Sequence, residues 1–222
     1  MEERTESTLT KKETWDSTFD HEILNFEDTG DEGEVWFGED VQQKAIDYIQ
    51  DNFSAKDMHV LDVGTGNAAF LIACREELDL ENLTGIDYSE KSIELSQKIL
   101  NAKFGDDNII TVKQGDAFEY LEEEKEKYTI VHDKGTFDVI YMMSEDNNHD
   151  YVKAIHFRMK PEENSRLIIT SCNCTGSELD GIFLKEDYFE KVEEIKGYRT
   201  MKFGGVIGQN VSTCVYKPLR KE

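Results

Sequence analysis

The chain contains little proline, little cysteine and no long apolar run. Two prolines among 222 residues exclude a proline-rich linker architecture. No segment approaches the ~18 consecutive apolar residues of a membrane span, and the charged N-terminus carries no apolar core of a signal peptide. Hydrophobic residues still make up 38%, enough to bury one sizeable core. We therefore expect a soluble, cytoplasmic protein with no membrane partner.

The four cysteines suit neither a disulfide framework nor a zinc site. No C-x-x-C pair exists, and Cys172 and Cys174 have no second pair at zinc spacing. The five histidines are scattered. We predict no metal, and we expect Cys74, Cys172, Cys174 and Cys214 to be reduced, buried thiols.

Basic residues are also scarce, with 25 against 48 acidic residues and a net charge of −23. A surface this negative repels a phosphate backbone, so direct binding to nucleic acid is not expected. The charge suits a basic protein partner or a small cationic ligand better. Solubility alone is the simpler interpretation of the same charge.

Strand and helix patterns alternate along most of the chain. Strands are predicted at 58–63, 83–87, 108–113, 128–133 and 166–172, and helices at 39–52, 66–78, 89–100 and 148–159, with a short helical stretch around 118–121. A terminal strand pair is predicted at 188–196 and 211–217, around the glycines at 204, 205 and 208. The alternation predicts an α/β fold with a mostly parallel sheet and helices on both faces.

Residues 1–38 differ from the rest in being polar and acidic. Their apolar content is mainly aromatic: Trp15, Phe19, Phe26, Trp36 and Phe37. We predict an N-terminal arm that is disordered at its start and docks by these aromatics, as a lid on one domain at 39–222.

A glycine turn follows the first predicted strand, in Val60-Leu61-Asp62-Val63-Gly64-Thr65-Gly66-Asn67-Ala68-Ala69. Gly64 and Gly66 allow the backbone to approach a ligand, and the helix that follows would present free N–H groups. Gly64-x-Gly66-x-x-Ala69 also fits the dinucleotide fingerprint, which leaves an NAD-dependent oxidoreductase as an alternative.

Asp62 favours a different ligand. Its carboxylate lies beside the turn where a dinucleotide would place its pyrophosphate, and two negative groups repel each other there. A cationic amino group would be attracted instead. S-adenosylmethionine carries such a group and has no phosphate.

Two further acids follow the next strands. Asp87 lies 21 positions after Gly66, the interval expected for a carboxylate that accepts the ribose hydroxyls. Tyr88 could lie against the adenine face, and Asp116 could accept the adenine amino group. Single acids of this kind often cap loops, but three at successive strand ends predict a binding site.

These residues resemble the class I, Rossmann-like S-adenosylmethionine-dependent methyltransferases. The family has a seven-stranded, mostly parallel sheet with an antiparallel last strand. The segment after the fourth strand, His132-Asp133-Lys134-Gly135-Thr136-Phe137-Asp138, resembles a subgroup of protein-lysine methyltransferases. Further segments are similar to the lysine methyltransferases of translation elongation factor 1-alpha: Trp15-Asp16, 33–38, 169–173 and 202–205.

The resemblance implies S-adenosyl-L-methionine as cofactor and elongation factor 1-alpha, a basic protein, as substrate of a monomeric enzyme. The implied cofactor-binding residues are Trp15, Asp62, Gly64, Thr65, Gly66, Asn67, Asp87, Tyr88, Gly115, Asp116, Ala117 and Asp133. The catalytic candidates, which would orient the lysine and keep it uncharged, are Asp133, Trp36, Phe37 and Phe137. Lys134 is expected to form a salt bridge, and His132 to be only a neighbour of Asp133.

One departure from the family lies at Asn67-Ala68-Ala69, where many relatives carry a further glycine after the Asn. We expect the opening helix to tolerate alanine there. A catalytically inactive binding module with the same fold remains an alternative.

Overall fold

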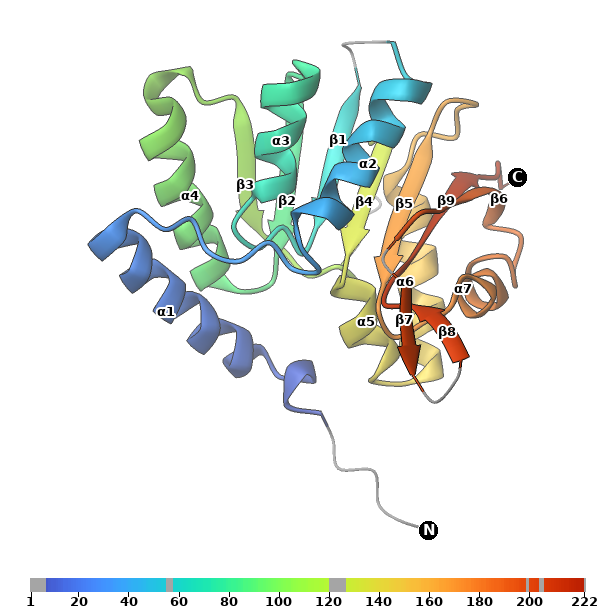
Figure 1. The fold of residues 1–222 in the computed structure, drawn as a ribbon. Coiled ribbons are helices and arrows are strands. Elements are labelled where there is room, and N and C mark those ends of the chain that lie inside the picture. Colours follow the sequence, from blue (N-terminus) through green and yellow to red (C-terminus); the bar gives the residue numbers. More distant parts are fainter. Residues whose placement is uncertain (1–6, 55–57, 120–126, 199, 204–205, 222) are drawn as a thin grey trace.

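The structure is a computed structural model that describes residues 7–54, 58–119, 127–198, 200–203 and 206–221. A seven-stranded sheet forms its centre, in the order β3-β2-β1-β4-β5-β9-β6 (Figure 1). The sheet strands are β1 (His59–Val63), β2 (Asn82–Asp87), β3 (Ile110–Gln114), β4 (Ile130–Lys134), β5 (Arg166–Ser171), β6 (Phe189–Ile195) and β9 (Ser212–Pro218). Strand β9 is antiparallel to both β5 and β6, and the pairings of β1 to β5 are parallel. The predicted sheet and its antiparallel last strand are confirmed.

Helices cover both faces of this sheet. They are α1 (Lys12–Thr29), α2 (Glu39–Asn52), α3 (Ala69–Leu78), α4 (Glu90–Phe104), α5 (Thr136–Tyr141), α6 (Glu145–Arg158) and α7 (Gly176–Phe183). Successive residues of a strand point to opposite faces, so Val60 packs with α1 to α4 while Leu61 and Val63 pack with α5 to α7. Each face therefore buries its own apolar cluster, and the strand ends stay available for a site.

The N-terminal arm differs from the prediction, because it contains helix α1 of 18 residues. It begins at Lys12 and ends before Gly30, which adopts the left-handed conformation with φ 78°. Phe19 and Ile23, one turn apart, are buried in the same cluster as α2, α3 and α4. The arm is thus part of the core on that face, and Figure 1 shows α1 beside α4.

Helix α3 begins three residues later than predicted. Ala68 is its N-cap, with φ 62°, and its side chain is fully buried. Alanine therefore lies in a left-handed turn before the helix, where glycine adopts the conformation at no steric cost. The expectation that the opening helix accommodates Ala68 was wrong.

Several other elements, all of them short, were not predicted from the sequence. Helices α5 and α7 were not predicted, and a separate hairpin joins β7 (Thr200–Phe203) to β8 (Val206–Gln209). Phe118 and Glu119 are not helical, and residues 120–121 of that prediction lie outside the described residues, as do Gly204 and Gly205. By contrast, Ser89 caps α4 as expected, accepting a hydrogen bond from the Ser92 N–H.

All four cysteines are free. Cys74, Cys174 and Cys214 are buried as predicted, but Cys172 is exposed after β5. No helix among the described residues is long and apolar enough to cross a membrane.

Candidate active site

A cavity of about 300 Å³ opens at the carboxyl ends of the central strands. Such edges hold the ligands of parallel α/β sheets. Residues at the ends of β1, β2, β3 and β4 line the cavity, together with α1 and the segment that joins α1 to α2. Figure 1 shows that segment crossing the same end of the sheet.

The glycine turn is fixed by contacts on every side. Gly64 has φ 69°, and a Cβ there would lie 1.8 Å from Thr136 Oγ1. The Gly66 N–H donates to Asp87 Oδ2 at 3.0 Å, and its carbonyl accepts from the Ser92 and Ser96 hydroxyls. This turn therefore has one conformation and room for no larger residue at Gly64.

The N–H groups of the turn are used within the protein. Gly64 N and Thr65 N both donate to the Ile86 carbonyl, and Gly66 N donates to Asp87. Ala69 N donates to Asn67 Oδ1. The expectation of free N–H groups for an anion was wrong at these positions, and the turn is unsuited to a pyrophosphate.

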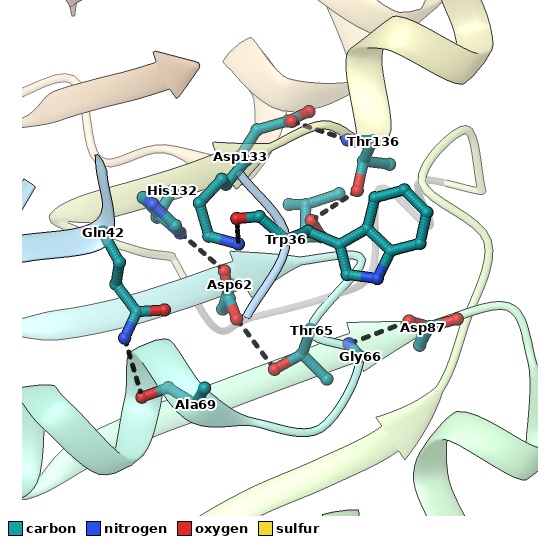
Figure 2. A network of polar contacts seen from close by, with 12 residues as sticks. Trp36, Gln42, Asp62, Thr65, Gly66, Ala69, Asp87, His132, Asp133 and Thr136 are labelled. Carbon is teal, nitrogen blue, oxygen red and sulfur yellow. Dashed lines mark hydrogen bonds and ion pairs between the residues drawn. The ribbon is translucent and has the colours of Figure 1, made fainter. Parts of the chain in front are cut away.

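Asp62 lies in the cavity wall with both carboxylate oxygens held (Figure 2). Oδ1 lies 2.7 Å from His132 Nδ1, and Oδ2 accepts from Thr65 Oγ1 at 2.8 Å. The His132 ring stacks on Phe70, with 3.5 Å between centroids. Burial lowers the pKa of His132, so the neutral ring donates its Nδ1–H to Asp62. His132 is thus more than a neighbour of Asp133, because it fixes the direction of Asp62.

The predicted ribose and adenine residues also line the cavity. Asp87 Oδ1 accepts from Ser89 N at 2.9 Å, and burial raises the pKa of this carboxyl. Tyr88 Oη is buried without a hydrogen-bond partner among the described residues. Asp116 Oδ1 accepts from Phe118 N at 2.9 Å, and the buried Arg158 holds the loop by donating to the carbonyls of Asp116 and Ala117.

The segment between α1 and α2 lies over the glycine turn. The Asn67 side chain donates to the Glu32 carbonyl at 2.9 Å, and Lys134 Nζ donates to the Trp36 carbonyl at 2.8 Å. The Trp36 ring, 41% exposed, lies 4.9 Å from that of Trp15. Phe37, with φ 66°, places its ring against Gly135, where a Cβ would come within 3.1 Å. Trp15, Trp36 and Phe37 therefore line the cavity.

Two predicted catalytic residues do not line the cavity. Asp133 is fully buried and accepts hydrogen bonds from Thr136 N, Phe137 N and the Tyr151 hydroxyl. Burial raises its pKa to about 7. Phe137 is also fully buried, against Tyr151 and Phe183. Both support helix α5, so their expected contact with lysine or cofactor is corrected to a structural role.

Several cavity residues were not found from the sequence. Gln42, His132, Lys134, Thr136, Asp138 and Asn173 all line it. Asp138 Oδ2 accepts from Cys172 N at 2.8 Å, which holds the loop after β5 at the rim. A signal was available for five of the six, since four lie within the segment 132–138 and Asn173 lies within 169–173, and both segments carry the resemblance.

Comparison with known proteins agrees with this geometry. A family model described as a methyltransferase domain matches residues 54–215. EEF1A lysine methyltransferase 2 of Danio rerio is 37% identical over 95% of this chain and 88% of its own length. The protein-lysine N-methyltransferase EFM4 of Saccharomyces cerevisiae is 34% identical over 95% of this chain and 94% of its own length.

Solved structures share the fold. Magnesium protoporphyrin IX methyltransferase of Synechocystis, with bound S-adenosylmethionine, has a TM-score of 0.63 at 16% identity and covers 97% of this chain and 98% of its own. The alternative of an NAD-dependent oxidoreductase is therefore wrong. The chain belongs to the S-adenosylmethionine-dependent methyltransferase family, in the group of protein-lysine methyltransferases that contains EEF1A lysine methyltransferase 2 and EFM4.

Proposed function

We propose that this enzyme methylates the ε-amino group of a lysine in translation elongation factor 1-alpha. The observation that carries the proposal is similarity over 95% of the chain to relatives named for that reaction. The acidic surface supports it, because a net charge of −23 attracts a basic protein.

The cavity residues fit S-adenosylmethionine. Asp62 offers a fixed carboxylate to the amino group, and Asp87 offers one to the ribose hydroxyls. Tyr88, Gly115, Asp116 and Ala117 form the wall proposed for adenine. Three buried polar atoms of the wall have no partner among the described residues, namely Gln42 Oε1, Tyr88 Oη and His132 Nε2, and so remain available to a ligand or water.

When bound, the cofactor supplies a methyl group on a sulfonium sulfur to an uncharged lysine amine. The protein's task is to align that amine, keep it uncharged and exclude water. We assign this task to Trp36 and Phe37, since burial beside aromatic rings lowers the pKa of a lysine.

The rim of the cavity suits the apolar stem of a lysine. Four large apolar side chains that line it are exposed: Leu9, Trp36, Met142 and Met143. Exposed apolar groups gathered at one opening are typical of a binding surface. We propose that they contact the methylene groups of the target lysine.

The test is incubation of the full chain with radiolabelled S-adenosylmethionine and purified elongation factor 1-alpha. We expect label on one lysine, located by mass spectrometry. Asp87→Asn should transfer much less label, and Asp51→Asn, which removes an exposed acid at the end of α2, should transfer as much as the unaltered chain.

Label on another protein, on nucleic acid or on a small molecule would contradict the substrate. Binding of S-adenosylhomocysteine without any transfer would support the inactive binding module instead.

A further inference from the structure

The described residues that line the cavity carry charge of almost one sign. Six of them are acids, namely Glu22, Glu34, Asp62, Asp87, Asp116 and Asp138. Lys134 is the single lysine or arginine among them. The amino-acid end of S-adenosylmethionine carries an α-carboxylate as well as an α-amino group. A carboxylate placed among these acids needs a cation or several N–H donors to hold it.

Lys134 lies at the carboxyl end of β4, next to the strand that ends with Asp62 and Val63. Its Nζ donates one hydrogen bond, to the Trp36 carbonyl. No carboxylate lies within ion-pair distance of it among the described residues, so the expected salt bridge is not formed. An ammonium has three N–H donors, which leaves two for a ligand.

Asp62 acts on Lys134 electrostatically. Burial lowers the pKa of Lys134, and the charges of Asp62 and Asp133 partly oppose this effect. A cation with a fixed carboxylate nearby forms a pair of opposite signs in the wall of one cavity. A zwitterionic amino acid requires that combination.

Several other polar groups of the wall already donate within the protein, and the Tyr88 hydroxyl, which has no partner among the described residues, is an uncharged donor. The N–H groups of Gly64, Thr65 and Gly66 donate within the protein. His132 donates from Nδ1 to Asp62, so its buried Nε2 is an acceptor, as is Gln42 Oε1. The hydroxyls of Thr65 and Thr136 donate to Asp62 and to the Val63 carbonyl.

We propose that Lys134 binds the α-carboxylate of the cofactor while Asp62 binds its α-amino group. The inference rests on the cofactor roles given under the proposed function. It also links the cofactor to the lid, because the same ammonium holds the Trp36 carbonyl. Lys134 is thus a cofactor-binding residue contributed by the segment 132–138.

Calorimetry on the full chain tests the assignment with two ligands. One is S-adenosylhomocysteine, and the other is its decarboxylated analogue, which keeps the amine and lacks the carboxylate. The unaltered chain should bind S-adenosylhomocysteine at least about tenfold more tightly, since hydrogen bonds between charged groups are strong. In Lys134→Met this preference should fall to about threefold or less.

The matched control is Lys103→Met. Lys103 holds the same lid segment from outside the cavity, through Glu32 Oε1 at 2.9 Å. If Lys134 only anchored the lid, Lys134→Met and Lys103→Met would each weaken the binding of the two ligands by the same factor. We expect Lys103→Met, and Lys134→Arg, which keeps the charge, to retain the preference.

A preference that persists in Lys134→Met would overturn the proposal. So would an unaltered chain that binds both ligands equally, a measurement that needs no variant to fold. Because the readout is binding, it does not depend on whether elongation factor 1-alpha is the substrate. A normal preference without methylation of that protein would contradict the proposed substrate alone.

Discussion

Asp133 shows at the scale of one residue how a carboxylate can serve folding rather than catalysis. It is fully buried, and its pKa is raised by burial to about 7 from an ordinary 3.8. A carboxyl with a raised pKa in the folded state stabilises the protein while protonated, and this contribution is lost as the pH rises from about 4 through 7. About three pKa units correspond to roughly 4 kcal/mol.

We predict that Asp133→Asn removes this pH-dependent loss of stability. The amide oxygen can still accept from Thr136 N and Phe137 N, and the amide nitrogen can donate to the Tyr151 hydroxyl. The free energy of unfolding should fall from pH 5 to pH 8 more steeply in the unaltered chain than in the variant, as measured by urea denaturation. Parallel curves would show that the carboxyl does not titrate in this range, and Asp51→Asn controls for the loss of any one acid.

The site residues that could be predicted from the sequence differ from the others in one physical respect, which is whether their place depends on the direction of a side chain within a strand. Asp62, Asp87 and Asp116 could be predicted because each lies within two residues of the carboxyl end of a strand, and strand ends of a parallel sheet meet at one edge. Within the segment 132–138 the choice between Asp133 and Lys134 depends on which face each side chain takes, since successive residues alternate. Only the register of β4 decides this, and it turns Lys134 to the cavity and Asp133 to the core.

At the scale of elements, α1 shows why an arm was predicted in place of a helix. Only Phe19 and Ile23 are buried along its 18 residues, which is too few for an apolar stripe to stand out. The helix is stabilised instead by contact with α4, where the Asp16 carboxylate accepts from the Ser89 hydroxyl at 2.6 Å. A chain that begins at Glu39 would uncover the apolar face that Phe19 and Ile23 cover, so truncation would change folding and the lid together.

The lid is therefore better tested by a single substitution. We predict that Trp36→Ala lowers kcat by about tenfold or more with a small change in melting temperature, because Trp36 is 41% exposed and packs mainly on Trp15. Steady-state kinetics beside thermal melting measures both effects. The matched control, Leu24→Ala, removes a side chain of α1 that is 63% exposed and does not line the cavity.

Unimpaired turnover in Trp36→Ala would show that the side chain has no part in closing the site. A large loss of stability would show that its contacts are structural. Either result contradicts the lid.

For the whole molecule, the sheet could be predicted because most of its parallel strands read as short apolar runs followed by a helix. Right-handed crossovers limit the strand orders that such units can adopt, but they do not select the observed order from among them. The place in the molecule where the acidic residues gather could not be predicted from the net charge alone. The structure places six acids around one cavity, at the edge where a protein substrate must enter.

The last prediction concerns that charge. With −23 on the enzyme and a basic protein as partner, attraction between the two fields should raise the association rate beyond that of neutral surfaces. Added salt screens such fields over about 10 Å at 0.1 M, so the rate constant for binding elongation factor 1-alpha should fall about tenfold between 20 mM and 200 mM salt. Stopped-flow fluorescence measures it, with binding of S-adenosylhomocysteine as the control, because that ligand carries no net charge and should associate at a nearly constant rate. A rate for the protein partner that does not change with salt would leave the acidic surface as a determinant of solubility alone.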